Sequence, residues 1–174
     1  MKKETNSKKS NMKELFIEEL KDVMSAEQQI IKALPNMIKA AESEDLKEAF
    51  TNHLEETRNQ AKRLEKIFKM LEVSGKGETC DAMEGLIKEG DKAIQDHTKS
   101  AIRDAAIISK AQRIEHYEIS AYGTLRTFAK ELDLDEAVEL LQESLDEEVN
   151  ADKILTKIAE GSLLISGVNQ KANK

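Results

Sequence analysis

Two glutamates in the segment 114–122 lie one helical turn apart in a stripe that is otherwise apolar. With the 3.6-residue period of a helix, Glu115 and Glu118 share one face with Tyr122 and Leu125. A carboxylate on such a face is costly to bury unless it meets a positive side chain or a metal ion. Because carboxylate oxygens are favoured ligands of hard divalent cations, this spacing indicates metal chemistry.

Acids also interrupt three other inward-facing stripes, each on a different predicted helix. Taken alone, each of these acids could lie at the edge of the core instead of acting as a metal ligand. Together they supply carboxylates from all four long helices. The acids are Glu27 in the segment 12–41, Glu56 in the segment 45–72, and Glu148 and Asp152 in the segment 135–160.

Three further polar residues share these faces and form a second group of candidates. A lone inward His53 is more often a hydrogen-bonded core group than a ligand, and Gln60 could be a buried amide that serves a neighbour. Tyr122, one turn from Glu118, could donate a hydrogen bond to a carboxylate or trap a radical. A core tyrosine whose hydroxyl is satisfied by a carboxylate is the simpler interpretation.

The composition favours an all-α protein. Of 174 residues, 35% are charged and 3% are aromatic, and proline occurs once. The net charge of −7 argues against a general nucleic-acid surface, and no apolar run approaches the length of a membrane span. Cys80 has no second cysteine to pair with, so we expect it to pack in the core.

Four long helices are predicted, with a short helix between the second and the third. The third long helix covers about 98–131 and the short one starts near Cys80 and ends near Gly90, while a kink or break is expected at Pro35. We interpret residues 1–11 as a disordered basic arm, 12–161 as the bundle and 162–174 as a tail.

Distances along the chain predict that the acids meet. Glu27 and Glu56 lie equally far from a polar turn near residue 42, and Glu115 and Glu148 lie equally far from a turn near 132. Two antiparallel hairpins joined by a long crossover form the ferritin-like four-helix arrangement. Carboxylates gathered at one depth then need two divalent ions, protons, or buried lysine and arginine partners, and the stripes contain almost no such basic residues.

Several motifs occur in the order and spacing of a known family. Over about residues 12–160 the chain resembles the YciF/YciE family of ferritin-like bacterial stress proteins. The motifs are SAEQQ (25–29), KALP (32–35), HLEET (53–57), CDAMEGL (80–86), QRIEHYE (112–118) and AYGT (121–124), together with Glu147, Glu148 and Asp152.

This resemblance implies a ferritin-like core, a homodimer, a cytoplasmic location and a link to stress responses. The segment from Glu115 to Tyr122 is also similar to the third helix of rubrerythrins, in which both glutamates bind a di-iron centre. The usual plan places a histidine three residues after a glutamate on two helices. Here Asn59 and Ala151 occupy those positions, so an oxygen-rich site for manganese or iron(II) is expected, with calcium or magnesium conceivable.

Three functions compete at this point. The first is a stress protein with a dinuclear iron or manganese site, at most a metal-dependent oxidoreductase acting on iron or peroxide. The second is a dimeric scaffold or binding protein whose site is empty or structural. The third is a DNA-protecting mini-ferritin that uses the basic arm, against which the acidic body argues.

Overall fold

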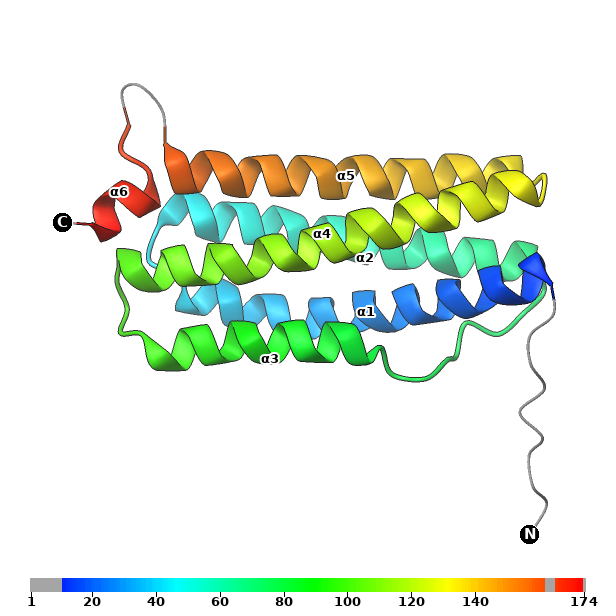
Figure 1. Cartoon of the computed structure of the whole chain (residues 1–174), viewed down its shortest axis with the longest axis horizontal. Coiled ribbons are helices and arrows are strands. Elements are labelled where there is room, and N and C mark those ends of the chain that lie inside the picture. Colours follow the sequence, from blue (N-terminus) through cyan, green and yellow to red (C-terminus); the bar gives the residue numbers. More distant parts are fainter. Residues whose placement is uncertain (1–10, 162–164, 174) are drawn as a thin grey trace, which may run out of the picture.

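The computed structural model describes residues 11–161 and 165–173, and the predicted basic arm lies almost wholly outside them. The chain forms an elongated helical bundle, and no strand occurs in the described ranges (Figure 1). The helices are α1 (Met12–Ala40), α2 (Glu44–Met70), α3 (Asp81–Asp96), α4 (Ala101–Glu131), α5 (Asp135–Glu160) and α6 (Val168–Ala172).

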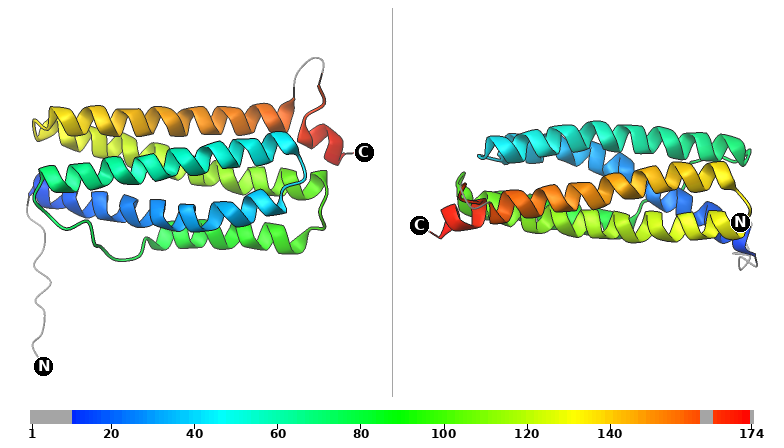
Figure 2. Two further views of the ribbon diagram at one scale, coloured as in Figure 1. Left: turned by 180° about the vertical axis from the view of Figure 1, so that it is seen from behind. Right: turned by 90° about the horizontal axis from the view of Figure 1, so that it is seen from above.

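The bundle consists of two antiparallel hairpins, α1–α2 and α4–α5, as predicted. The crossover between them carries α3, which packs outside the bundle against α1 and α4 (Figures 1 and 2). Within the described residues, no helix combines the length and the apolar character that crossing a membrane requires.

The α1–α2 turn is held by contacts from the start of α4. The Asp104 carboxylate accepts hydrogen bonds from the backbone N–H groups of Glu42 (2.9 Å) and Ser43 (2.7 Å), where α2 begins. Arg103 donates to the carbonyl of Ala40 at 2.6 Å, where α1 ends. These groups would otherwise lack partners at helix termini, so the start of α4 fixes the α1–α2 turn. The α4–α5 turn contains Asp133 in a left-handed conformation (φ 55°).

The crossover is docked on the bundle through Cys80, immediately before α3. The Cys80 N–H donates to Ser25 Oγ at 2.9 Å, and the Cys80 thiol lies 3.1 Å from both Asp22 Oδ2 and the Tyr117 hydroxyl. Gln29 donates to the Cys80 carbonyl at 3.1 Å. Cys80 is buried, so the structure supports a packing role for this thiol.

Some predicted boundaries were wrong. Of the kink or break expected at Pro35, the break does not occur, and α1 continues through this exposed residue, which removes only one backbone donor. Helix α3 extends six residues past Gly90, since burial of Ala93 offsets the helix cost of glycine. The short helix α6, which was not predicted, buries Val168 and packs against α4 and α5.

A layer of polar side chains divides the apolar core into two clusters. One cluster, near the α1–α2 turn, includes Leu34, Phe50 and Ile107. The other, near the α4–α5 turn, includes Phe16 and Leu125. The polar layer lies between the two clusters and combines side chains from all four long helices. Its members are Glu27, His53, Gln60, Glu115, Glu118 and Glu148.

Candidate metal centre

Four residues of the polar layer converge closely enough to hold one metal ion. His53 from α2, Glu115 and Glu118 from α4, and Glu148 from α5 each offer one ligand atom, and these atoms all lie within 4.8 Å of one another. All four side chains are buried, with at most 5% of any residue exposed. Imidazole nitrogen and carboxylate oxygen together suit iron or manganese, whereas calcium and magnesium sites in proteins are built from oxygen ligands.

Each residue of this group has at least one buried ligand atom that lacks a hydrogen-bond partner. Both carboxylate oxygens of Glu118 are buried without a partner, as are Glu115 Oε2 and Glu148 Oε2. Neither ring nitrogen of His53 forms a hydrogen bond, and the Nε2 atom lies 3.5 Å from Glu115 Oε2. Buried polar atoms are nearly always satisfied, so this concentration of unpartnered atoms fits a site that receives a cation. The residues present therefore fit a metal ion.

Burial and mutual repulsion change the acidity of the layer. Burial raises the pKa of Glu27 to about 8, and the nearby Glu148 carboxylate adds to this rise. Burial likewise raises the pKa values of Glu115 and Glu118 well above their ordinary range. Burial alone would lower the pKa of His53, but the surrounding carboxylates, Glu115 foremost, outweigh it and raise this pKa to about 10. Without a metal, the layer therefore retains protons.

Glu27 is fixed by a tyrosine rather than by the four-residue group. The Tyr122 hydroxyl donates to Glu27 Oε1, while Glu27 Oε2 is buried without a partner. Burial raises the pKa of Tyr122 well above 10, and the neighbouring Glu27 and Glu118 charges act in the same direction. Tyr122 thus stays protonated and orients one oxygen of Glu27, which leaves the other available.

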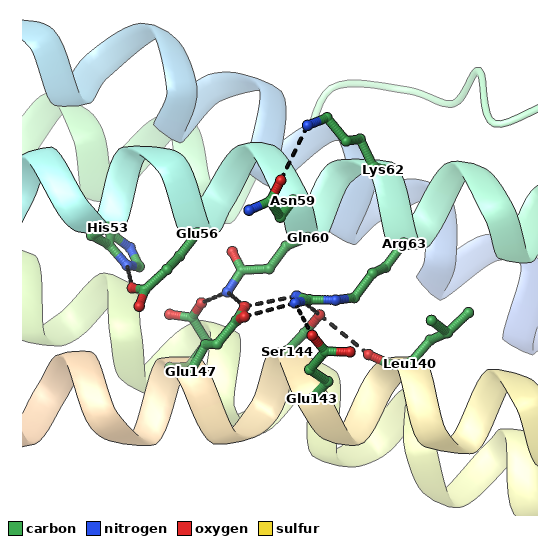
Figure 3. Close-up of polar contacts among 11 residues, drawn as sticks. His53, Glu56, Asn59, Gln60, Lys62, Arg63, Leu140, Glu143, Ser144 and Glu147 are labelled. Carbon is green, nitrogen blue, oxygen red and sulfur yellow. Dashed lines mark hydrogen bonds and ion pairs between the residues drawn. The ribbon is translucent and has the colours of Figure 1, made fainter.

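Gln60 connects the buried layer to an ion pair nearer the surface (Figure 3). Its Nε2 atom donates to Glu148 Oε1 and, at 3.0 Å, to Glu147 Oε2. The Arg63 guanidinium donates to both Glu147 oxygens at 2.7 Å and also reaches Glu143. This chain of donors holds Glu148 from the side of α2. Gln60 Oε1 remains buried without a partner.

Three of the predicted ligands, Glu27, Glu56 and Asp152, lie outside the four-residue group. Glu56 Oε2 is 3.6 Å from His53 Nδ1, and the Glu56 side chain is 34% exposed. Asp152 accepts a hydrogen bond from Gln112 at 3.0 Å, and its charge still contributes to the raised pKa of Glu115. The role of Glu27, Glu56 and Asp152 as ligands stays a prediction.

From the sequence, His53 was placed only in the second group of candidate ligands, and Arg63 was not recognised as part of the site. His53 stands three residues before Glu56, which reverses the order of the usual Glu-x-x-His motif, and this reversal was a usable signal. Asn59, at the usual histidine position, is exposed. Arg63 follows Gln60 by three residues and therefore shares its face of α2, but periodicity alone could not show that Glu147 faces it.

Comparisons with known proteins agree with this architecture. Residues 11–173 match the family described as "Domain of unknown function (DUF892)". The chain is 43% identical to Protein YciF of Escherichia coli over 166 residues, which cover 93% of this chain and 97% of that protein.

Two solved structures are similar along most of their length. The crystal structure of the E. coli stress protein YciF superimposes with a TM-score of 0.85 at 38% identity, covering 95% of this chain and 99% of the other. YcfI of Rhodopseudomonas palustris has a TM-score of 0.85 at 43% identity, covering 88% and 98%.

Proposed function

We propose that this chain, which belongs to the DUF892 family, is a stress-response protein whose polar layer binds iron or manganese between the four long helices. The observation that carries this proposal is the convergence of His53, Glu115, Glu118 and Glu148, each of which has a buried ligand atom without a hydrogen-bond partner. The link to stress comes from the E. coli relative, which is described as a stress protein.

A second ion is part of the proposal, because the layer contains more carboxylates than one ion needs. Glu27, with one oxygen held by Tyr122, and Glu56, beside His53, are the further ligands we assign to it. A bound pair of iron or manganese ions would supply redox chemistry with iron(II) or peroxide as the substrate. We also propose that the protein is a cytoplasmic homodimer, which the family resemblance implies.

A non-enzymatic scaffold is the second candidate, and the acid–base properties of the layer favour it. Burial raises the pKa of Glu27 to about 8, so protons can neutralise part of the layer without any metal. Gln60 and Tyr122 also donate hydrogen bonds to two carboxylate oxygens of the layer, Glu148 Oε1 and Glu27 Oε1. In this case the polar layer would specify how the helices align rather than hold a cofactor.

Metal analysis separates the two candidates. The protein is purified without chelator, its metal content is measured, and peroxide consumption and iron(II) oxidation are then assayed. The metalloprotein proposal predicts stoichiometric iron or manganese, which chelation removes and added metal restores. A folded protein that contains neither metal and takes up neither on titration would favour the scaffold.

A further inference from the structure

A cavity of about 500 Å³ opens between the first half of α2 and the second half of α5. His53 and Glu115 of the four-residue group line it, together with Glu56. Figure 3 shows the side chains of His53 and Glu56 on the side of α2 that faces α5. The cavity therefore connects the polar layer with solvent, and its volume lies in the range of small-molecule sites.

The two walls of this cavity differ in chemistry. The α2 wall presents the carboxylates of Asp45, Glu48 and Glu56, and no lysine or arginine lines the cavity. Asp45 and Glu48 are exposed, and neither forms an ion pair with another described residue. A cavity mouth that carries charges of one sign attracts ligands of the opposite sign. The mouth therefore favours cations and disfavours anions, whereas His53, which retains a proton, lies at the inner end.

The α5 wall is apolar. Apart from Asn150 it is formed by Ala151, Ile154, Leu155 and Ile158, and Ile154 is one of the few large apolar side chains that remain exposed. A hydrated metal ion gains nothing from such a wall, whereas the hydrocarbon part of an organic molecule gains free energy for each apolar area that it covers. The acidic wall therefore favours a positively charged group, and the apolar wall favours the hydrocarbon part of an organic molecule.

The inner end of the cavity holds polar atoms that are ready for a ligand. His53 is only 5% exposed and forms no hydrogen bond through either ring nitrogen, and Glu115 Oε2, 3.5 Å from His53 Nε2, is buried without a hydrogen-bond partner. These are the atoms that a molecule entering from solvent would meet last. Their unsatisfied state is independent of the acids at the mouth.

We propose that this cavity binds a small organic cation, an amine with an aliphatic or aromatic part, whose ammonium group faces the α2 wall and whose hydrocarbon part covers the α5 wall. The proposal goes beyond metal binding, since it concerns a pocket that exists with or without an ion. Only its extension, that such an amine is brought next to the metal as a substrate or effector, rests on the proposed function.

The test uses three probes of equal chain length on the full-length protein in chelator. Hexylamine, 1-hexanol and hexanoate are titrated, and the methyl resonances of Ile154, Leu155 and Ile158 are followed by NMR. We expect hexylamine to shift these methyls and to bind about tenfold more tightly than hexanol, because carboxylates at the mouth attract its charge. Hexanoate should cause no shift. Equal binding of all three probes, or no binding of hexylamine at millimolar concentration, would overturn the proposal.

A double variant tests the source of the preference. Asp45→Asn with Glu48→Gln removes two charges from the mouth and should bring hexylamine close to hexanol in affinity. The control, Glu136→Gln with Glu139→Gln, removes two exposed charges at the same spacing near the start of α5, at the end away from the cavity, and should keep the preference; Glu136 also pairs with Lys66. An unchanged preference in the Asp45/Glu48 variant would place the amine elsewhere and reject the assignment.

Metal content keeps this proposal separate from the proposed function. The Asp45/Glu48 variant retains all four residues of the converging group, so its iron or manganese content should equal that of the wild type. Amine binding without metal binding would reject the metalloprotein and keep the pocket. Metal binding without amine binding would reject the amine pocket and keep the metalloprotein.

Discussion

Tyr122 and Glu27 come from different helices, α4 and α1, and form a hydrogen bond in which both side chains are fully buried. The phenol donates to one carboxylate oxygen, and no other described group satisfies the second oxygen. This contact joins the two hairpins at the depth of the polar layer. It therefore links the stability of the bundle to the state of the site.

Removing this hydroxyl should weaken the metal-free protein. In Tyr122→Phe, Glu27 Oε1 loses its partner, which leaves both oxygens of this buried carboxyl unsatisfied, and we expect the free energy of unfolding to fall by about 1–3 kcal/mol. Urea unfolding in chelator measures this loss. A midpoint of unfolding at the same urea concentration as that of the wild type would show that the hydrogen bond contributes nothing to stability.

The metal-free protein should lose stability as pH rises from about 5 to 9. The pKa of Glu27 is about 8 in the folded protein against an ordinary 4.5, so its contribution is complete below pH 4.5 and is lost as pH rises through 8. The pKa of His53 is about 10 against 6.5, so its contribution is complete below pH 6.5 and is lost towards pH 10.

Urea unfolding in chelator across this pH range tests the sign. A metal ion displaces the retained protons, so the stability gained from manganese should grow with pH over the same range. A metal-free stability that increases from pH 5 to 9 would contradict the raised pKa values.

Arg63 should contribute more to stability than Arg58, the other arginine of α2. Its side chain is 13% exposed and pairs with Glu147, so Arg63→Leu leaves that carboxylate without its main partner. We expect a loss of about 1–3 kcal/mol in the free energy of unfolding. The control Arg58→Leu removes an arginine that is 47% exposed and pairs with Glu55, and it should cost about 0.5 kcal/mol or less. Equal losses in the two variants would show that the contacts linking Gln60, Glu147 and Arg63 stabilise the fold no more than an exposed ion pair does.

Cys80 should be unreactive in the folded protein. Burial raises the pKa of its thiol, and the thiol is enclosed by Asp22 and Tyr117. We expect a thiol reagent such as DTNB to react on the order of a hundredfold more slowly in buffer than in urea, since the thiolate is the reactive form. Rapid reaction in buffer would show that the crossover opens at this point.

Much of the fold was predictable because the helices are long and strongly periodic. The match of Glu27 with Glu56, and of Glu115 with Glu148, across two short turns indicated the antiparallel hairpins that the structure confirms. The sequence could not show α6, because a five-residue helix has too little periodicity to detect and depends on packing against α4 and α5.

The polar layer was predictable in its acids but not in its arrangement. Burial of Glu27, Glu115, Glu118 and Glu148 follows from their stripes. On α2 the predicted inward stripe included His53, Glu56 and Gln60, and the structure buries His53 and Gln60 together with Thr57 but leaves Glu56 at the edge of this face. Periodicity cannot show which of several polar residues at the edge of a face is buried. Contacts from α4 and α5 decide it instead.

Urea unfolding of the double variant Glu115→Gln with Glu118→Gln, in chelator and with added manganese or iron(II), tests the metal site most directly. Wild type should gain about 2.7 kcal/mol when free metal is a hundred times its dissociation constant, and the variant should gain almost nothing. In chelator the variant should equal or exceed wild type, since two crowded buried carboxyls are replaced by neutral amides. The control Glu136→Gln with Glu139→Gln should retain the metal gain. A wild type that gains nothing from either metal, with a variant weaker in chelator by about 3 kcal/mol or more, would contradict the metal site and assign these glutamates to structural pairing.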